Sequence, residues 1–489
     1  MLTAYTLTYE TLTAINSLKR KAMKIFNNIL ALVAITAAGL AFTSCEDQPD
    51  KFENTSGIPS VNYIRSLSGE TQNKNDEEDR KYTFGELVEQ ASPQEVLCLV
   101  GNNLKSVYKA FFNDCEVTLN TSYMEDKTLI LTVPEQIPTR VTDKLYLVTK
   151  SNDTVKYDFH IIIPAPTINN MSCEYAERGS VASISGKYLI NDPSFPLAVK
   201  FTDKNGNQVN ADIKKIAEDY TSVDFVIPEN AAEGSIAISS IYGETKASFN
   251  YMDSRGMLFD FDGKTGLGNH GWHSRTIKSD ETSLCGNFLQ LGENGATLSE
   301  DAGWDDANFS FEYWAGSWDT PQNITSGDGI ALFNLADFKD SQNKALKFEM
   351  YIPSSNPWQA GAMQICFQPL EQVTISGNAI EGYDNVAAAN MYVFNGEGTG
   401  GDWAKGNWGR GMYRPWTDTG KFDTGDKWIT VTIPLTSLIY DRTGAVTSNT
   451  PSKETDFASF TMFVMGGGIT GTECSPIIKV DNIRVVPIK

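Results

Sequence analysis

The stretch LKFEMYI, residues 346–352, alternates apolar and polar side chains along its whole length. Successive side chains of an extended strand point to opposite faces, so this pattern predicts a strand with one face in a core. The core face would hold Leu346, Phe348, Met350 and Ile352. The outward face would hold Lys347, Glu349 and Tyr351.

The same period recurs around this stretch. It appears in FSFEYW (309–314) and MQICFQ (363–368), and strand-like runs follow in WITVTIPLTSL (428–438) and IIKVDNIRVVP (477–487). Helical periodicity is nearly absent, and its best candidate is FGELVEQ (84–90). We therefore predict an all-β protein whose C-terminal part is a jelly-roll-like β-sandwich.

Two upstream segments repeat one pattern. A proline-led strand (58–64, then 165–171) precedes a Gly-x-x-Leu motif (GNNL, 101–104, then GKYL, 186–189). Each unit continues through a phenylalanine strand to a hydrophobic-Pro-Glu tripeptide. The pattern resembles the IPT/TIG immunoglobulin-like fold, a small two-sheet sandwich. We interpret both units as spacers, with docking of a partner protein as the alternative.

The N-terminus has the layout of an export signal. An apolar run at 29–42 is too short to span a bilayer comfortably and is followed by Cys45. This arrangement resembles a bacterial lipoprotein signal that starts at Met23, in which Cys45 carries the acyl chains. The acidic EDQPD that follows resembles the tether of Bacteroidetes lipoproteins at the outer cell surface. A plain secretory signal is the alternative.

These features predict five parts. Residues 1–45 are the lipoprotein signal region and 46–57 the tether. Two IPT/TIG-like domains follow at 58–164 and 165–252, and a larger β-sandwich domain occupies 253–489.

Composition excludes several function classes. The formal net charge of −21 and the absence of a basic stripe argue against nucleic-acid binding. Three histidines and no CxxC pair supply no recognisable zinc site, so we expect no metal and no cofactor.

All nine tryptophans lie in the C-terminal part, which is more than a core of this size usually uses. Three of them fall in the glycine-rich GTGGDWAKGNWGRGMYRPW (398–416). If the strands above are neighbours, their outward face carries Trp314, Tyr351, Gln364 and Gln368. Such a surface suits a sugar, because a pyranose stacks its C–H face on an indole and its hydroxyls pair with planar amides, carboxylates and guanidinium groups.

Taken together, the lipoprotein start, the repeats and the sandwich resemble the Bacteroidetes surface glycan-binding protein B family. The resemblance implies a glycan site of exposed aromatic residues in the C-terminal domain. By this resemblance, the site would include Trp272 (in HGWH) and Tyr313, Trp314 and Trp318 (in EYWAGSW). Strand alternation, however, places Tyr313 on the core face.

Loop residues would extend this platform. We expect Trp358, Trp403 and Trp408 to add rings, and Gln364 and Arg410 to bind hydroxyl groups. Trp416 and Trp428 are interpreted as structural.

The predicted function is that of an outer-membrane, cell-surface lipoprotein that binds a polysaccharide without cleaving it. The expected ligand is a β-linked plant glycan such as xyloglucan or mixed-linkage glucan, because a flat platform suits a flat chain. The family resemblance implies service to a SusC/SusD-like transporter. A surface adhesin is one alternative. The other is a β-sandwich glycoside hydrolase or lyase, for which Glu312 and Glu349 could supply the paired carboxylates.

Overall fold

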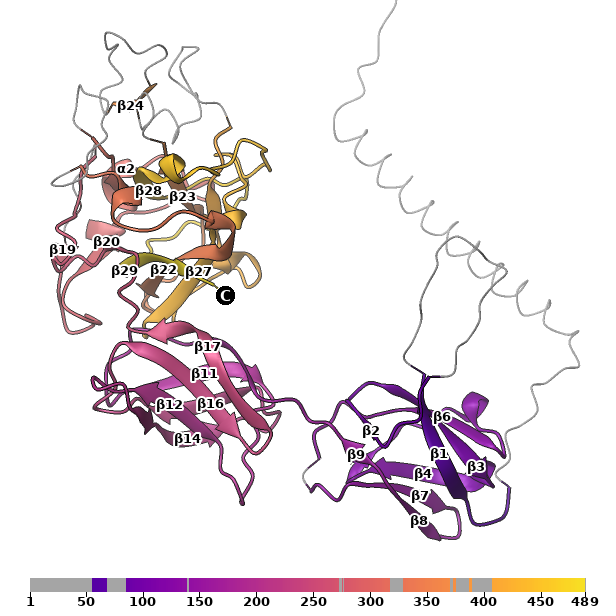
Figure 1. Ribbon diagram of the computed structural model, residues 1–489. Coiled ribbons are helices and arrows are strands. Elements are labelled where there is room, and N and C mark those ends of the chain that lie inside the picture. The colour runs from indigo at the N-terminus through magenta and orange to yellow at the C-terminus, as the bar shows by residue number, and fades with distance from the viewer. Residues whose placement is uncertain are drawn as a thin grey trace, which may run out of the picture. The chain divides into compact units, whose positions relative to one another are not determined.

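The computed structural model describes residues 55–67, 85–138, 140–271, 275, 277–316, 329–369, 373–374, 387–388 and 407–488. The chain divides between Ile162 and Ile163 into two compact units (Figure 1). Among the described residues, no helix is both long and apolar enough to cross a membrane.

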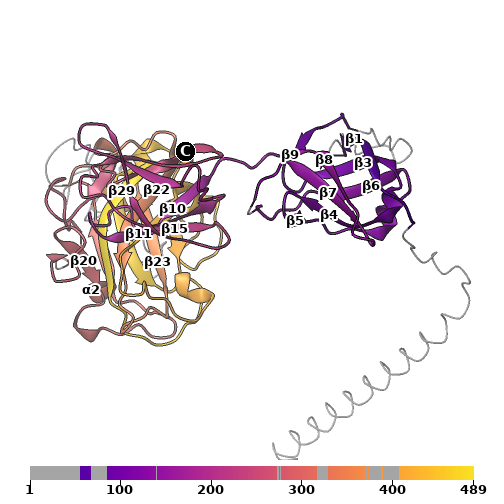
Figure 2. The ribbon, with the colours of Figure 1, turned by 90° about the horizontal axis from the view of Figure 1, so that it is seen from below.

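The first unit is a small two-sheet sandwich (Figure 2). One sheet has the order β1-β3-β6 and the other β5-β4-β7-β8, and β2 pairs with β9 in parallel. The strands are β1 (Ser60–Ser66), β2 (Gln90–Ala91), β3 (Val96–Asn102), β4 (Val107–Phe112), β5 (Cys115–Glu116), β6 (Thr128–Thr132), β7 (Lys144–Thr149), β8 (Thr154–Asp158) and β9 (His160–Ile161).

The second unit begins with a sandwich of the same kind. Its sheets have the orders β10-β11-β15-β14 and β13-β12-β16-β17. The strands are β10 (Thr167–Met171), β11 (Val181–Lys187), β12 (Ala198–Thr202), β13 (Gln208–Asn210), β14 (Asp212–Ile216), β15 (Ser222–Val226), β16 (Gly234–Ser240) and β17 (Gly243–Tyr251).

The repeated Gly-x-x-Leu motif has one structural reason in both sandwiches. A Cβ atom added to Gly101 would lie 1.8 Å from the carbonyl oxygen of Ser60, and one added to Gly186 would lie 1.9 Å from that of Thr167. Each glycine therefore lets two paired strands close where the first strand carries a bulge. The leucine three residues later is fully buried in both copies.

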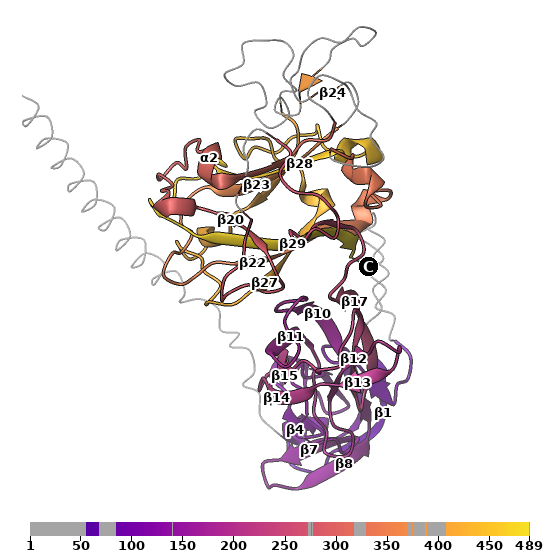
Figure 3. The same ribbon diagram turned by 90° about the vertical axis from the view of Figure 1, so that its left-hand side faces the viewer.

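The larger sandwich has two layers (Figure 3). The β29 sheet has the order β19-β20-β29-β22-β27, with β18 also paired to β29, and the β28 sheet has the order β21-β28-β23-β26. The β29 sheet comprises β18 (Met257–Phe259), β19 (Ile277–Lys278), β20 (Phe288–Leu291), β22 (Lys344–Tyr351), β27 (Ile429–Pro434) and β29 (Ile478–Pro487). The β28 sheet comprises β21 (Ser310–Tyr313), β23 (Ala362–Gln368), β26 (Gly411–Tyr413) and β28 (Ser459–Met465).

Two short elements complete this domain. The helix α2 (Asp306–Phe309) leads into β21, and the pair β24 (Val373–Thr374) and β25 (Ala387–Ala388) is parallel. The all-β prediction is confirmed, whereas the expected domain boundaries stay predictions.

The core faces follow the alternation read from the sequence. One buried cluster fills the space between the two sheets, and it contains every predicted core residue of the three stretches: Phe309, Phe311, Tyr313, Leu346, Phe348, Met350, Ile352, Met363, Ile365 and Phe367. Their alternation predictions are confirmed.

Two local expectations are wrong. Residues 85–90 form no helix; Leu87 makes a β-bridge with Arg65, and Gln90 begins β2. The strand β22 does not neighbour β21 or β23 but lies in the opposite sheet, so Tyr351 is not on the face that carries Gln364. Alternation determines which side of a strand faces the core, but long-range pairing decides to which sheet the strand belongs.

Candidate functional site

The outer face of the β28 sheet gathers most of the predicted site. In the strand register Gln364 of β23 lies opposite Phe463 of β28, and Cys366 lies opposite Thr461. On the neighbouring strand Ser310 lies opposite Phe463 and Glu312 lies opposite Thr461. None of these six side chains belongs to the cluster between the sheets, so all point away from it.

A layer of large side chains covers this face. The indole N–H of Trp314 donates to Thr461 Oγ1 at 3.3 Å, and that of Trp408 donates to the carbonyl of Phe367 at 2.7 Å. The indole of Trp304 packs against Phe463 in a tilted arrangement, with ring centroids 4.9 Å apart. The outer face is therefore a second packed layer rather than an open surface.

Burial corrects the expected role of several tryptophans. Trp314, Trp358 and Trp408 are only 2%, 0% and 7% exposed. Trp358 belongs to the core between the sheets, and its indole N–H donates to the carbonyl of Ala360 at 2.6 Å. The expectation that these rings form an exposed platform is wrong, because each indole N–H finds an acceptor inside the fold and the ring fills internal space.

Tyr313 is also internal. Its ring lies in the core, and its hydroxyl donates to the carbonyl of Ile330 at 2.6 Å. Strand alternation therefore predicted the position of Tyr313 correctly, and the exposed position implied by the family resemblance is wrong. Trp416 is buried, as expected for a structural residue, with its N–H on the carbonyl of Gly361.

Gln364 and Arg410 bind each other. The guanidinium of Arg410 donates to Gln364 Oε1 at 3.1 Å, and the Gln364 amide donates to the carbonyls of Arg442 and Met465. Both side chains are about 1% exposed, and burial lowers the pKa of Arg410. This pair supports the layer above the sheet, which corrects the expectation of two surface groups that bind hydroxyls.

Glu312 and Glu349 do not form a carboxylate pair. Glu312 lies on the outer face of the β28 sheet and Glu349 on that of the β29 sheet, with the core between them. Glu349 is held by Arg484 at 2.8 Å. The arrangement considered for glycoside hydrolysis is therefore not present at these two positions.

At one end of the β28 sheet the described chain stops before the segments that contain Trp272, Trp318 and Trp403. Strands β21 and β23 both run antiparallel to β28, so their C-terminal ends lie together beside the first residue of β28. The described chain stops just beyond these ends, at Gly316 and Pro369. Gly271 reaches the same end, because the preceding residue, His270, forms a parallel bridge with Tyr313.

The other ends of these segments return to the same place. Gly316 donates to the carbonyl of Gly329, where the described chain resumes. The indole of Trp408, just after the chain resumes at Asn407, bonds to the carbonyl of Phe367 near the end of β23. Trp272, Trp318 and Trp403 themselves, like Cys45, lie outside the described residues.

The same end of the sheet holds a buried side-chain amide, that of Gln368, which could accept a further hydrogen bond. The Gln368 amide donates to Thr461 Oγ1 at 3.0 Å, while its oxygen, fully buried, has no hydrogen-bond partner among the described residues. No group of three or more metal-ligating side chains occurs in the part of the chain that the structure describes.

One exposed tryptophan was not singled out by sequence reasoning. Trp304 is 46% exposed, the largest value among the described tryptophans. The available signal was its context, EDAGWDDANF, in which carboxylates flank the ring on both sides and indicate a surface segment.

Comparisons with known proteins agree on one family. The model described as the surface glycan-binding protein B xyloglucan binding domain matches residues 251–487. The crystal structure of the surface glycan-binding protein PbSGBP-B from Prevotella bryantii is 41% identical, with a TM-score of 0.70, and the match covers 89% of this chain and all of that chain.

Two further relatives are more distant. An IPT/TIG domain-containing protein of Bacteroides ovatus is 23% identical over 214 residues, which are 42% of this chain and only 40% of that protein's own length. The SGBP-B of a complex xyloglucan utilization locus in Bacteroides uniformis is 13% identical with a TM-score of 0.39, and covers 88% of this chain and all of that chain. The last likeness is too weak for a structural conclusion.

Proposed function

This chain belongs to the surface glycan-binding protein B family, and we propose that it holds its polysaccharide at the end of the β28 sheet where Trp272, Trp318 and Trp403 attach. The observation that carries the proposal is the convergence of three chain segments on that end. Each of them contains one tryptophan in its sequence, and the described residues at that end of the sheet are tightly packed.

The proposed ligand is a neutral β-linked plant glycan. Xyloglucan is the first candidate, because the matching family model is named for it. Mixed-linkage glucan is the second. A flat sugar chain exposes its C–H faces to several rings in turn, and indoles lose little conformational freedom on binding.

The proposed role is capture without cleavage. Of the two carboxylates weighed for catalysis, one is locked in an ion pair and the other lies across the core from it. The chain would concentrate the glycan beside a SusC/SusD-like transporter and remain tied to the outer membrane through acylated Cys45.

The binding test uses the ectodomain and a panel of plant and fungal polysaccharides. Gel retardation measures binding, and the release of reducing ends measures cleavage. We expect retardation by xyloglucan or mixed-linkage glucan with no new reducing ends. Sustained release of reducing ends, or no retardation by any glycan, would overturn the proposal.

The location test replaces Trp272, Trp318 and Trp403 by Ala one at a time. Loss of a stacking ring should weaken retention about 10-fold at each position. The matched control is Phe195→Ala, because Phe195 is 48% exposed and lies in the preceding immunoglobulin-like sandwich. Unchanged retention in all three variants would place the site elsewhere.

The anchor has its own test. Cys45→Ala should abolish incorporation of labelled palmitate and release the protein from the membrane fraction, while purified ectodomain keeps its affinity for glycan. Labelled Cys45→Ala protein would contradict the assignment of the acylated residue.

A further inference from the structure

A cavity lies between the second immunoglobulin-like sandwich and the large sandwich, both of which belong to the same compact unit. Residues of β10 and β17 line one side of it, and residues of β22 and β27 line the other. Its volume is about 330 Å³. This value falls within the range of small-ligand pockets, about 300–1,000 Å³, which often occur at domain interfaces. None of the residues nominated above for the glycan site lines this cavity.

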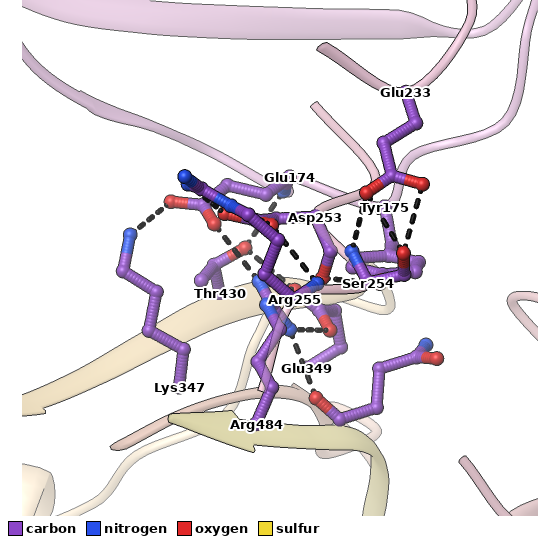
Figure 4. A network of polar contacts seen from close by, with 11 residues as sticks. Glu174, Tyr175, Glu233, Asp253, Ser254, Arg255, Lys347, Glu349, Thr430 and Arg484 are labelled. Atoms are coloured by element: carbon purple, nitrogen blue, oxygen red, sulfur yellow. Dashed lines mark hydrogen bonds and ion pairs between the residues drawn. The ribbon is translucent and has the colours of Figure 1, made fainter. Parts of the chain in front are cut away.

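The ammonium group of Lys347 lines the cavity with donors to spare. Its side chain is only 6% exposed, and among the described residues it donates a single hydrogen bond, to Glu174 (Figure 4). The ring of Phe249 lies 4.9 Å from the same nitrogen. Because an ammonium carries three N–H groups, two of them have no oxygen acceptor among the described residues. A buried cation is stabilised by every hydrogen bond it makes, so this nitrogen favours a ligand with acceptor oxygens.

Further polar groups around the cavity are also unused. The side chains of Asn169, Ser248 and Thr432 line it, and none of them makes a hydrogen bond to another described residue. One amide and two hydroxyls offer both donors and acceptors, which is the pairing that sugar hydroxyls require. The lining also includes the apolar side chains of Met171 and Ile488, which can contact the C–H groups of a sugar ring.

The charges beside the cavity cancel one another. Glu174 pairs with Lys347 and Arg484, and Glu349 pairs with Arg484. Two carboxylates and two cations leave no net charge, so a charged ligand would lose its hydration without gaining a counter-charge. The cavity therefore favours a neutral molecule that carries several hydroxyl groups.

We propose that this cavity is a second carbohydrate site, which holds one neutral pyranose unit with Lys347 donating to its hydroxyls. The inference rests on the proposed glycan-binding function and adds a site to it. The cavity lies against the β29 sheet, whereas the glycan site proposed above is at the end of the β28 sheet. Two separate sites on one protein strengthen the hold on a long polymer more than on a short fragment.

The experiment observes the cavity directly by NMR. The ectodomain is isotope-labelled at its Met and Ile methyl groups, so that Met171 and Ile488 report on the cavity. The probe is methyl β-D-glucoside. Both signals should shift and saturate with a dissociation constant of about 1 mM, since the site offers hydrogen bonds but no indole. Unshifted signals at about 10 mM glucoside would overturn the proposal.

A charged probe tests the class of ligand. Methyl β-D-glucuronide carries a carboxylate where the glucoside carries a hydroxymethyl group. It should bind at least about 5-fold more weakly, because the cavity has no net charge to compensate it. Equal or tighter binding of the glucuronide would make the cavity an anion site and overturn the assignment.

Two variants test the location. Ser248→Trp should fill the cavity and abolish the shifts, whereas Asn169→Ala, which adds no bulk, should weaken binding about 3- to 10-fold. The control is Val181→Trp, which puts the same ring on β11 of the same sandwich at a position that is 63% exposed, and it should change nothing. Shifts that persist in Ser248→Trp, or an unchanged constant in Asn169→Ala, would mean that the sugar binds elsewhere.

This inference and the proposed function fail separately. Replacing Trp272, Trp318 and Trp403 together by Ala should abolish retention at the β28 site but leave the shifts of the two methyl signals. If the unaltered protein shows neither retardation by any glycan nor methyl shifts, the proposed function fails. If a polysaccharide retards it while both methyl signals stay fixed, the second site alone is overturned.

Discussion

The two sheets of the large sandwich have outer faces of opposite character. The outer face of the β29 sheet meets the preceding immunoglobulin-like sandwich through ion pairs, whereas that of the β28 sheet is covered by indoles, amides and one arginine. Both faces read in the sequence as the polar side of an alternating strand. One forms an internal interface between two sandwiches, and the other leads to the end of the sheet at which we propose the glycan site.

The joint is a network of two carboxylates and two cations (Figure 4). Arg484 donates to Glu349 and to Glu174 of the preceding sandwich, each at 2.8 Å, and Lys347 pairs with Glu174. The Thr430 hydroxyl donates to Glu349 and accepts from the backbone N–H of Glu174. Charges this deeply buried are tolerated only when fully paired, so the joint is specific and intolerant of partial loss.

The largest expected effect comes from breaking this joint. Arg484→Met leaves Glu349 and one oxygen of Glu174 buried without their cation, which should cost about 3–5 kcal/mol in the free energy of unfolding. The measurement is urea unfolding of the ectodomain. Lys200→Met, which removes a more exposed pair with Glu244, should cost less than about 1 kcal/mol. A loss below 1 kcal/mol for Arg484→Met would mean that the network is not essential to the joint.

An intermediate effect is expected on the β28 face. Gln364→Leu removes the amide that bonds Arg410 and two carbonyls, so it should cost about 1–3 kcal/mol and weaken glycan binding only as far as stability falls. The control Gln342→Leu removes a hydrogen bond to Asp340 at an exposed position and should be nearly neutral. Lost affinity with unchanged stability would show that Gln364 touches the ligand after all.

The third effect depends on pH and lies again on the β29 face. Burial raises the pKa of Asp481 to about 9; the N–H of Asn482 opposes the shift, while the charges of Glu349, Asp262 and Asp260 add to it. Because the folded state keeps the proton, the stability from this group is complete below about pH 4 and is lost as the pH rises toward 9.

Asp481→Asn should therefore be more stable than the unaltered protein at neutral pH. The difference should grow by up to about 1.4 kcal/mol per pH unit between pH 5 and 7. Thermal unfolding of both proteins across this range is the measurement. Parallel curves would show that Asp481 titrates normally in the fold.

Sequence reasoning predicted the fold better than the site. Period-2 alternation placed Leu346, Phe348 and Tyr313 correctly, because the face of a strand is a local property of the backbone. The same reasoning placed Tyr351 beside Gln364, which is wrong because sheet membership depends on pairing between distant segments. In the glycine-rich segment 398–416, Trp408 and Arg410 were expected to bind sugar, but both side chains are packed against β23.

The sequence by itself determined the all-β class, the two repeated sandwiches, the core faces and the family, since these depend on local periodicity, spacing and composition. Only the tertiary structure decided which tryptophans meet water. Trp358 and Trp304 are the same residue type in similar loops, yet one is fully buried and the other half exposed. Exposure depends on which distant segments pack over a ring, and a local pattern such as the acidic neighbours of Trp304 indicates it only in part.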